Sequence, residues 1–480
     1  MKISKTELQN KIKGGWAAQT IGCSYGGETE FGWKGKMIPD NYAIPWNDSI
    51  MYRLFTTKGG LYDDVYMDLI FVDMFEKHGF DVSAKELGNA FAHADFLLWH
   101  ANQLARYNIL RGINPPESGN WMNNPHADCI DYQIESDFAG LMSPGMPETS
   151  CRISDKVGHI MNSGDGYYGG VFVGVLYSLA FTNNDIHYII KEALKAIPEK
   201  SSFHRCINDV VDFYEKNPSD WKAAWKMLDE KWDNDMACSE GLYDDFNIDA
   251  KLNSAYCMIG LLYGNGDFGK TMEFATRCGQ DSDCNPATAA GILGVILGYD
   301  AIPDKFLKPC KLVENKNFDG VDMSLNKVYQ IGYKHALAMI KQNGGTVEKD
   351  VVVIKVQPVK TVPYEQNFEG MRLAGKIAGQ KITSGYTFDF EGNGFLIMGN
   401  GETANEKLRN DFVVQFELSV DNNAPEIMAF PLNYKFKLHR ELAWKYLLPE
   451  GKHQVKLEWK NPNKEVTIDC RGTAIYTTIK

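Results

Sequence analysis

The stretch Gly279–Gly298, GQDSDCNPATAAGILGVILG, places Asp281 and Asp283 on a glycine-bearing turn directly before a long apolar helix. An earlier stretch, Gly59–Asp64 (GGLYDD), also ends in a pair of aspartates at the start of a helix. Hard divalent cations such as Mg²⁺, Ca²⁺ and Mn²⁺ prefer oxygen ligands, and several carboxylates must converge to offset the charge of the ion. Two acid pairs that are far apart in the sequence therefore predict a site for at least one such cation.

The periodicity of apolar residues changes once along the chain. From about Leu8 to Gln342 apolar residues recur at intervals of three and four, which predicts helices. After Asn343, short alternating runs separated by turn residues predict the strands of a β-sandwich. We therefore expect an all-α domain over residues 1–345, with long loops around residues 22–60 and 100–165. An all-β sandwich of jelly-roll-like type, a candidate carbohydrate-binding module, is expected over residues 346–480.

Composition narrows the class of function. A chain of 480 residues with 44% hydrophobic and 23% charged residues is typical of a globular protein with two domains. Its net charge of -12 argues against nucleic acid as a partner, because phosphate binding needs a basic surface. No uncharged apolar run is long enough to span a bilayer, and the N-terminus has no apolar signal segment. We expect a cytoplasmic protein, or a periplasmic or secreted one if a signal has been removed, and the oligomeric state stays open.

Three stretches of the predicted helical region together resemble the ADP-ribosylglycohydrolase family. They are Gly14–Phe31 (GGWAAQTIGCSYGGETEF), Gly60–Phe71 (GLYDDVYMDLIF) and Gly279–Gly298, which follow in the family's order and spacing. The resemblance covers about residues 8–300 and leaves the strand-rich region outside.

The resemblance implies an all-α fold that holds two Mg²⁺ ions and an enzyme that releases ADP-ribose. It implies that Glu30 positions or activates the attacking water. Glu30 and Asp281 are accordingly the predicted catalytic residues. The ligands implied by position are Asp63, Asp64, Asp281 and Asp283.

Three residues depart from the family pattern. Tyr62 and Cys284 replace threonines beside the two acid pairs, and Cys23 replaces an acidic residue of the first motif. Cysteine is a soft ligand for a hard ion, and a tyrosine ring does not fit the space of a threonine hydroxyl. We therefore expect one or two divalent ions, Mg²⁺ first, with Ca²⁺ or Mn²⁺ as alternatives.

Aromatic and polar residues in loops or at helix starts are candidates for substrate contacts. Aromatic rings in such places can stack on a sugar or an adenine. The resemblance also points to a histidine-bearing loop before a helix. The predicted substrate-binding residues are Tyr62, Trp121, His159, Asn162, Asp165 and Tyr167. A third acid pair, in Gly241–Asp245 (GLYDD), is expected at the rim of the pocket or is fortuitous.

The sequence leaves three functions open. The first is a metal-dependent hydrolase that cleaves a glycosidic bond at the anomeric carbon of an ADP-ribose-like or ribosyl substrate. The second is a carbohydrate-active glycoside hydrolase on the same scaffold, which the aromatic-rich loops and the added sandwich favour. The third is a binding protein with a degenerate site, which the missing hydroxyl ligands favour.

Overall fold

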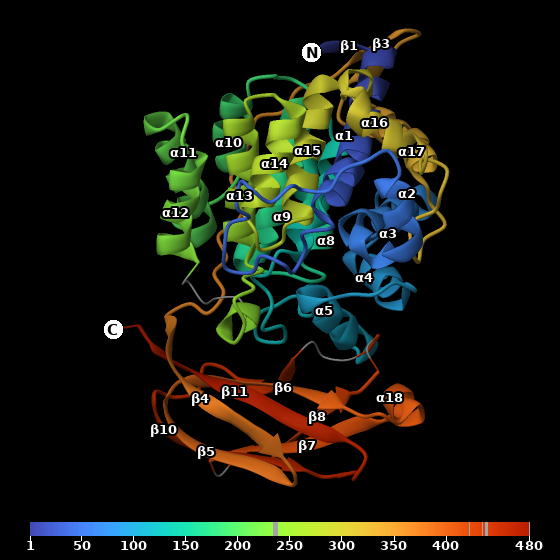
Figure 1. Cartoon of the computed structure of the whole chain (residues 1–480). Coiled ribbons are helices and arrows are strands. Elements are labelled where there is room, and N and C mark those ends of the chain that lie inside the picture. Colours follow the sequence, from blue (N-terminus) through green and yellow to red (C-terminus); the bar gives the residue numbers. More distant parts are fainter. Residues whose placement is uncertain (234–238, 422, 434, 437–439, 480) are drawn as a thin grey trace.

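The computed structural model describes the chain except residues 234–238, 422, 434, 437–439 and 480. Figure 1 shows two lobes, a helical lobe that contains the N-terminus and a β-sandwich formed by the C-terminal part of the chain. The predicted order, an all-α domain followed by an all-β domain, is confirmed.

The helical lobe is built around long buried helices, among them α9, α13 and α15, whose residues are buried on nearly every side. Shorter helices cover them. The helices of this lobe are α1 (Lys5–Gly26), α2 (Ile50–Thr57), η1 (Gly59–Tyr62), α3 (Asp63–His78), α4 (Ala84–His93), α5 (His100–Leu110), α6 (Asp131–Ile134), α7 (Asp137–Leu141), α8 (Pro147–Gly158), α9 (Gly164–Ala180), α10 (Ile186–Leu194), α11 (Ser202–Lys216), α12 (Trp221–Trp232), η2 (Ser239–Leu242), α13 (Ala250–Gly264), α14 (Phe268–Arg277), α15 (Cys284–Leu297), η3 (Tyr299–Ala301), α16 (Asp304–Lys311) and α17 (Leu325–Gln342).

Helices α1 and α15 pack at close range because glycines of α1 face the partner backbone. A Cβ atom on Gly22 would lie 2.7 Å from the Cα of Ala287, and one on Gly26 would lie 2.6 Å from the Cα of Asp283. Real Cβ atoms do not approach backbone atoms so closely, so these positions admit no larger residue. Helix α1 therefore fixes the turn that carries Asp281 and Asp283.

The expectation of long loops around residues 22–60 and 100–165 is right for residues 27–49 and 111–130 and wrong for the rest of the two regions. Helix α1 extends to Gly26, and the second region contains α5, α6, α7 and α8. In α5 the buried residues include Asn102, Gln103 and Arg106, so polar and apolar residues alternate without helical periodicity. Arg106 donates to the carbonyl oxygens of Phe96 and Ala94, which gives two nitrogen atoms of its buried guanidinium partners inside the lobe. Buried polar side chains of this kind hide a helix from a hydrophobicity pattern.

The predicted domain boundary at residue 345/346 lies too early. The run at 351–353 does form a strand, but β3 (Val351–Val353) pairs with β1 (Lys2–Ser4) and β2 (Thr346–Val347) in a small sheet of the helical lobe. The chain then runs on along this lobe, where the backbone N–H of Val362 donates to Ala196 O at 2.9 Å. The sandwich begins with β4 at Met371.

The sandwich consists of two antiparallel four-stranded sheets in the order β5-β10-β7-β8 and β4-β11-β6-β9. Of the two tryptophans available for a sugar platform, Trp459 is buried in the core and Trp444 donates to Met122 O of the helical lobe at 2.9 Å. The Trp444 side chain is half-buried against the sandwich. The elements are β4 (Met371–Ile382), β5 (Gly385–Gly392), β6 (Gly394–Glu402), α18 (Glu406–Asp411), β7 (Val413–Val420), β8 (Glu426–Pro431), β9 (Glu441–Lys445), β10 (Gly451–Trp459) and β11 (Thr467–Thr478).

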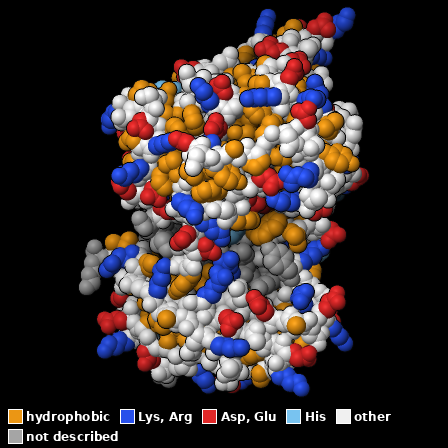
Figure 2. Space-filling model, viewed as in Figure 1, with side chains coloured by type: hydrophobic (Ala, Val, Ile, Leu, Met, Phe, Trp, Pro, Cys, Tyr) orange, Lys and Arg blue, Asp and Glu red, His pale blue; other side chains and the backbone are white. Residues whose placement is uncertain are grey.

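Buried polar contacts join the two lobes. His126 Nε2 lies 2.6 Å from Glu441 Oε1, and both side chains are fully buried. Figure 2 shows a waist between the lobes, where basic and acidic side chains lie beside apolar surface. Within the described residues, no helix combines the length and the apolar character needed to cross a bilayer.

Candidate active site

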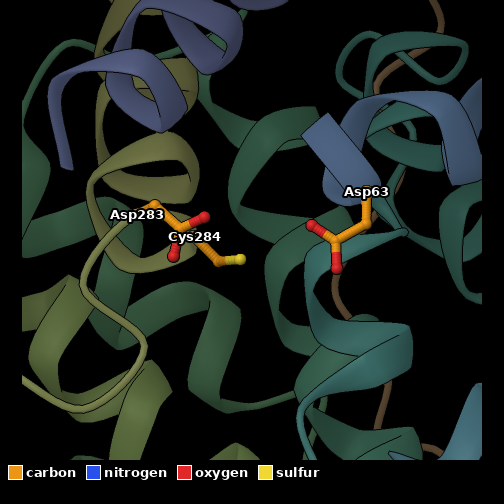
Figure 3. Close-up of side chains that lie close together, drawn as sticks. All are labelled: Asp63, Asp283 and Cys284. Atoms are coloured by element: carbon orange, nitrogen blue, oxygen red, sulfur yellow. The ribbon is translucent and has the colours of Figure 1, made fainter. Parts of the chain in front are cut away.

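One aspartate from each acid pair lies close to the other at the starts of two helices. Asp63 is the first residue of α3, and Asp283 directly precedes α15, which begins with Cys284. One ligand atom from each of these three side chains lies within 4.8 Å of the others. Figure 3 shows Asp63 facing Asp283 and Cys284 from a separate element across a gap. The structure thus brings together residues about 220 positions apart, as a cation site with ligands from two remote segments requires.

Asp63 and Cys284 border a cavity of about 590 Å³. Glu30, Asp63, Asp281 and Cys284 contribute to its lining. Its remaining walls combine apolar and polar side chains, as is usual for a small-molecule site. They are Phe31, Lys34, Lys58, Gly60, Leu61, Leu98, Trp99, His100, Asn102, Ile130, Asp131, Ile134, Phe246, Ile248, Asn400 and Arg440.

Burial and mutual repulsion make this acid cluster hard to ionise without a cation. Desolvation raises the pKa of Asp63 to about 7 and the pKa of Asp281 to about 7. The pKa of Asp64 is raised well above its usual value by burial and by the charge of Asp63. Burial and the charge of Asp281 do the same to the pKa of Asp283. A cation among these carboxylates would reverse the effect.

The donor set fits a divalent cation. Both carboxylate oxygens of Asp64 and Oδ1 of Asp283 are buried without a hydrogen-bond donor in the described part of the chain. Asp283 precedes α15 but makes no side-chain capping hydrogen bond, so helix capping does not account for it. Buried acceptors without partners are costly, and a bound cation is one group that would satisfy such oxygens.

Glu30 and Asp131 are further carboxyl groups of the cavity. Burial, together with the charges of Asp283 and Asp63, raises the pKa of Glu30 well above its usual value. Asp131 was missed by the sequence reasoning because no motif surrounds it. Its carboxylate accepts from the backbone N–H groups of Ala101 and Asn102, which holds it at the start of α5. Burial raises the pKa of Asp131 to about 6.

The prediction that Tyr62 contacts substrate is wrong. Its ring is buried against Phe55 and Phe318, with centroid separations of 4.2 and 5.9 Å. Its hydroxyl group lies 2.9 Å from Ser24 Oγ. The larger residue thus points away from the acids into an aromatic cluster. Cys23, which also departs from the family pattern, is buried, and its thiol donates to Leu61 O.

The other residues predicted to bind substrate, Trp121, His159, Asn162, Asp165 and Tyr167, do not line this cavity either, so that prediction is wrong for this cavity. Asn162 is buried, and its amide donates to Ala127 O and Cys129 O. Asp165 accepts from the backbone N–H of Phe203 at 3.2 Å. These contacts leave both side chains committed to holding neighbouring segments.

His159 and Trp121 instead contact the segment that leads to the sandwich, and Tyr167 supports His159. His159 Nε2 lies 2.9 Å from Glu365 Oε1, and its ring stacks on Tyr167 with centroids 4.2 Å apart. Trp121 packs on Phe368, with centroids 4.9 Å apart. They hold the interdomain segment on the helical lobe. Loop position alone does not distinguish a ring that binds sugar from one that binds another part of the chain.

The third acid pair, in Gly241–Asp245, lies near the cavity, which agrees with the expectation that it stands at the rim of the pocket. Asp244 Oδ2 lies 3.4 Å from Lys34 Nζ and 3.8 Å from Arg440 Nη1, and both basic residues line the cavity. Arg440 and Asn400 were not predicted, because they come from the sandwich and carry no motif.

Comparison with protein families gives a match over most of the helical region. The ADP-ribosylglycohydrolase family model matches residues 4–330. The chain belongs to the ADP-ribosylglycohydrolase family. Members of this family hydrolyse glycosidic bonds, and the match includes both acid pairs and Glu30. The sandwich lies outside it. A search of curated protein sequences found no match to this chain.

Solved structures give weaker likenesses. A structure described as an ADP-ribosylglycohydrolase-related protein complex is 14% identical and has a TM-score of 0.47, with 69% of this chain and 98% of that chain covered. A family GH115 4-O-methyl-α-glucuronidase with specificity for decorated arabinogalactans is 12% identical and has a TM-score of 0.21. The likeness to the glucuronidase covers 66% of this chain and 40% of that chain.

Proposed function

We propose that the chain is a metal-dependent hydrolase that cleaves the glycosidic bond at the anomeric carbon of an ADP-ribose-like or ribosyl substrate. The observation that carries this proposal is the meeting of Asp63, Asp283 and Cys284 beside a cavity, with the buried oxygens of Asp64 lacking donors. Membership of the ADP-ribosylglycohydrolase family supports the reaction class.

Asp63, Asp64, Asp281 and Asp283 would hold the ion, and Cys284 lies beside them. A divalent ion bound there would orient vicinal sugar hydroxyls and lower the pKa of a water molecule. Glu30 lines the same cavity, where its carboxyl group would take up and pass on a proton at that water. The carboxylates would also stabilise the positive charge that develops at the anomeric carbon.

Divalent metal is expected to stabilise the protein and to be required for turnover. Binding to the native state alone raises stability by about 2.7 kcal/mol at a ligand concentration one hundred times Kd. The melting temperature of chelator-treated protein should therefore rise on addition of Mg²⁺ or Mn²⁺. Release of ADP-ribose from ADP-ribosyl-arginine should require the same ion. If no divalent metal changes either quantity, the degenerate binding protein is the better description.

Replacing Cys284 by threonine is expected to strengthen Mg²⁺ binding. Burial and the nearby aspartates raise the pKa of the Cys284 thiol well above its usual value, so it offers a protonated, soft sulfur to the site. Cys284→Thr supplies an oxygen of similar size at the first residue of α15. Calorimetric titration should show a lower Kd for Mg²⁺. The control Cys310→Thr, at a buried cysteine outside the cavity lining, should leave Kd unchanged.

A carbohydrate-active glycoside hydrolase is the second candidate. The observation in its favour is that Asn400 and Arg440 bring part of a domain outside the family match into the cavity lining. Cleavage of aryl furanosides or oligosaccharides, with no release of ADP-ribose from its conjugates, would support this candidate over the first.

A further inference from the structure

The cavity beside the acid cluster is not enclosed by the helical lobe alone. Asn400 lies on β6, and Arg440 directly precedes β9, which pairs with β6. Both residues line the cavity, together with Lys34 from the segment after α1. The β6 and β9 edge of one sheet therefore forms part of the wall.

One carboxylate brings together cations from the two lobes. Asp244 Oδ2 lies 3.4 Å from Lys34 Nζ and 3.8 Å from Arg440 Nη1. The rings of Phe31 and Phe246 lie 5.6 and 5.0 Å from the same ammonium group. Asp244 thus holds Lys34 and Arg440 close to each other at one place in the cavity lining.

The backbone of Arg440 is held from both sides. Its N–H donates to Glu441 Oε2 at 3.1 Å, and its carbonyl oxygen accepts from the N–H of Gly399 at 2.7 Å. Glu441 is in turn fixed to the helical lobe through the buried contact with His126. A buried polar pair of this kind sets position more than it adds stability. The interface thus places Arg440 at the cavity rather than leaving it on a loose rim.

The chemistry of these cations indicates what they recognise. Several carboxylates already line the cavity, so an anionic ligand would be repelled unless basic groups met it. A guanidinium group offers donors in a fork that matches phosphate and carboxylate oxygens, and an ammonium group adds a point charge. We propose that the β-sandwich completes the substrate site, and that Arg440 with Lys34 binds an oxyanion, phosphate or carboxylate, carried by the glycoside. This inference rests on the proposed function, which places the reacting bond at the acid cluster.

Binding by full-length protein tests the inference. The probes are ribose 5-phosphate against ribose, and glucuronic acid against glucose, each titrated calorimetrically in the presence of Mg²⁺. One of the two anions should bind the wild type at least tenfold more tightly than its neutral counterpart. Arg440→Gln should lower the affinity for that anion by about ten- to a hundredfold and leave the affinity for the neutral sugar unchanged. The pair that responds distinguishes a phosphate from a carboxylate substrate.

Two further variants guard against a trivial loss of structure. Lys34→Gln should also lower the affinity for the same anion. Arg471→Gln, at an exposed position on β11 in the same domain, should bind as the wild type does. The inference is overturned if the wild type prefers neither anion, or if Arg440→Gln and the wild type bind the preferred anion equally.

The metal response separates this inference from the proposed function. Mg²⁺ should raise the melting temperature of the wild type and of Arg440→Gln by the same amount, since Arg440 is not a ligand. A metal response without an anion preference contradicts only the role of Arg440. An anion preference without any metal response supports the role of Arg440 in binding and contradicts the metal-dependent hydrolase.

Discussion

Replacing Asp281 and Asp283 together by asparagine is expected to lower kcat at least about 1,000-fold. The loss of several kcal/mol of charge stabilisation at the reacting carbon accounts for that size, because each 1.36 kcal/mol is a factor of ten in rate. The variant should also lose the rise in melting temperature on addition of Mg²⁺. Turnover is measured on ADP-ribosyl-arginine, and melting by circular dichroism.

The stability of the metal-free variant distinguishes a metal site from a structural role. The pKa values of Asp281 and Asp283 are raised, to about 7 for Asp281, by burial and neighbouring acids. A carboxyl group whose pKa is higher in the folded protein destabilises the fold as the pH rises from its unfolded pKa to its folded pKa. At pH 8 the double variant should therefore melt at the same temperature as metal-free wild type or higher.

Asp267 provides the matched control. It caps α14 through a hydrogen bond from the N–H of Lys270, and it does not line the cavity. Asp267→Ala should cost about 1 kcal/mol of stability and leave the metal response intact. If the Asp281/Asp283 double variant instead behaves like Asp267→Ala, the aspartates serve as structural groups and the metal mechanism is excluded.

The acid cluster was accessible from the sequence because each half of it is local. Asp63 and Asp283 both stand where a helix begins, and a helix start is among the features that short sequence patterns indicate well. Their meeting followed from the family's order of motifs. The sequence shows that these helices contain small residues, but only the structure shows that Gly26 lies where α1 and α15 approach each other.

The rest of the cavity depends on tertiary docking, which no local pattern encodes. Arg440 reaches the site because Glu441 is fixed to His126, a contact between residues 315 positions apart. Local sequence also could not give the direction of the Tyr62 side chain, although it correctly placed this residue beside Asp63. Its direction is decided by Phe55 and Phe318, which offer an aromatic cluster on the opposite side.

Replacing Gly26 by alanine is expected to cost roughly 3 kcal/mol or more of stability and to weaken metal binding as well. The new Cβ would collide with the carbonyl oxygen of Ser282 and lie 2.6 Å from the Cα of Asp283. Both are backbone atoms, so neither yields by a rotation of a side chain, and overpacking of this kind forces a backbone shift. The shift would move the turn that carries Asp281 and Asp283.

Two glycines make the experiment specific. A Cβ on Gly375, in β4, meets no atom within 4 Å, so Gly375→Ala should leave melting temperature and metal affinity unchanged. Gly22→Ala would press on α15 beside Ala287, past the turn, and should lower stability with a smaller effect on metal affinity. Chemical denaturation gives the free energies of unfolding, and calorimetry gives Kd for Mg²⁺. An unchanged Kd in Gly26→Ala would mean that the acid turn is held by contacts other than α1, because the added Cβ presses directly on Ser282 and Asp283 of that turn.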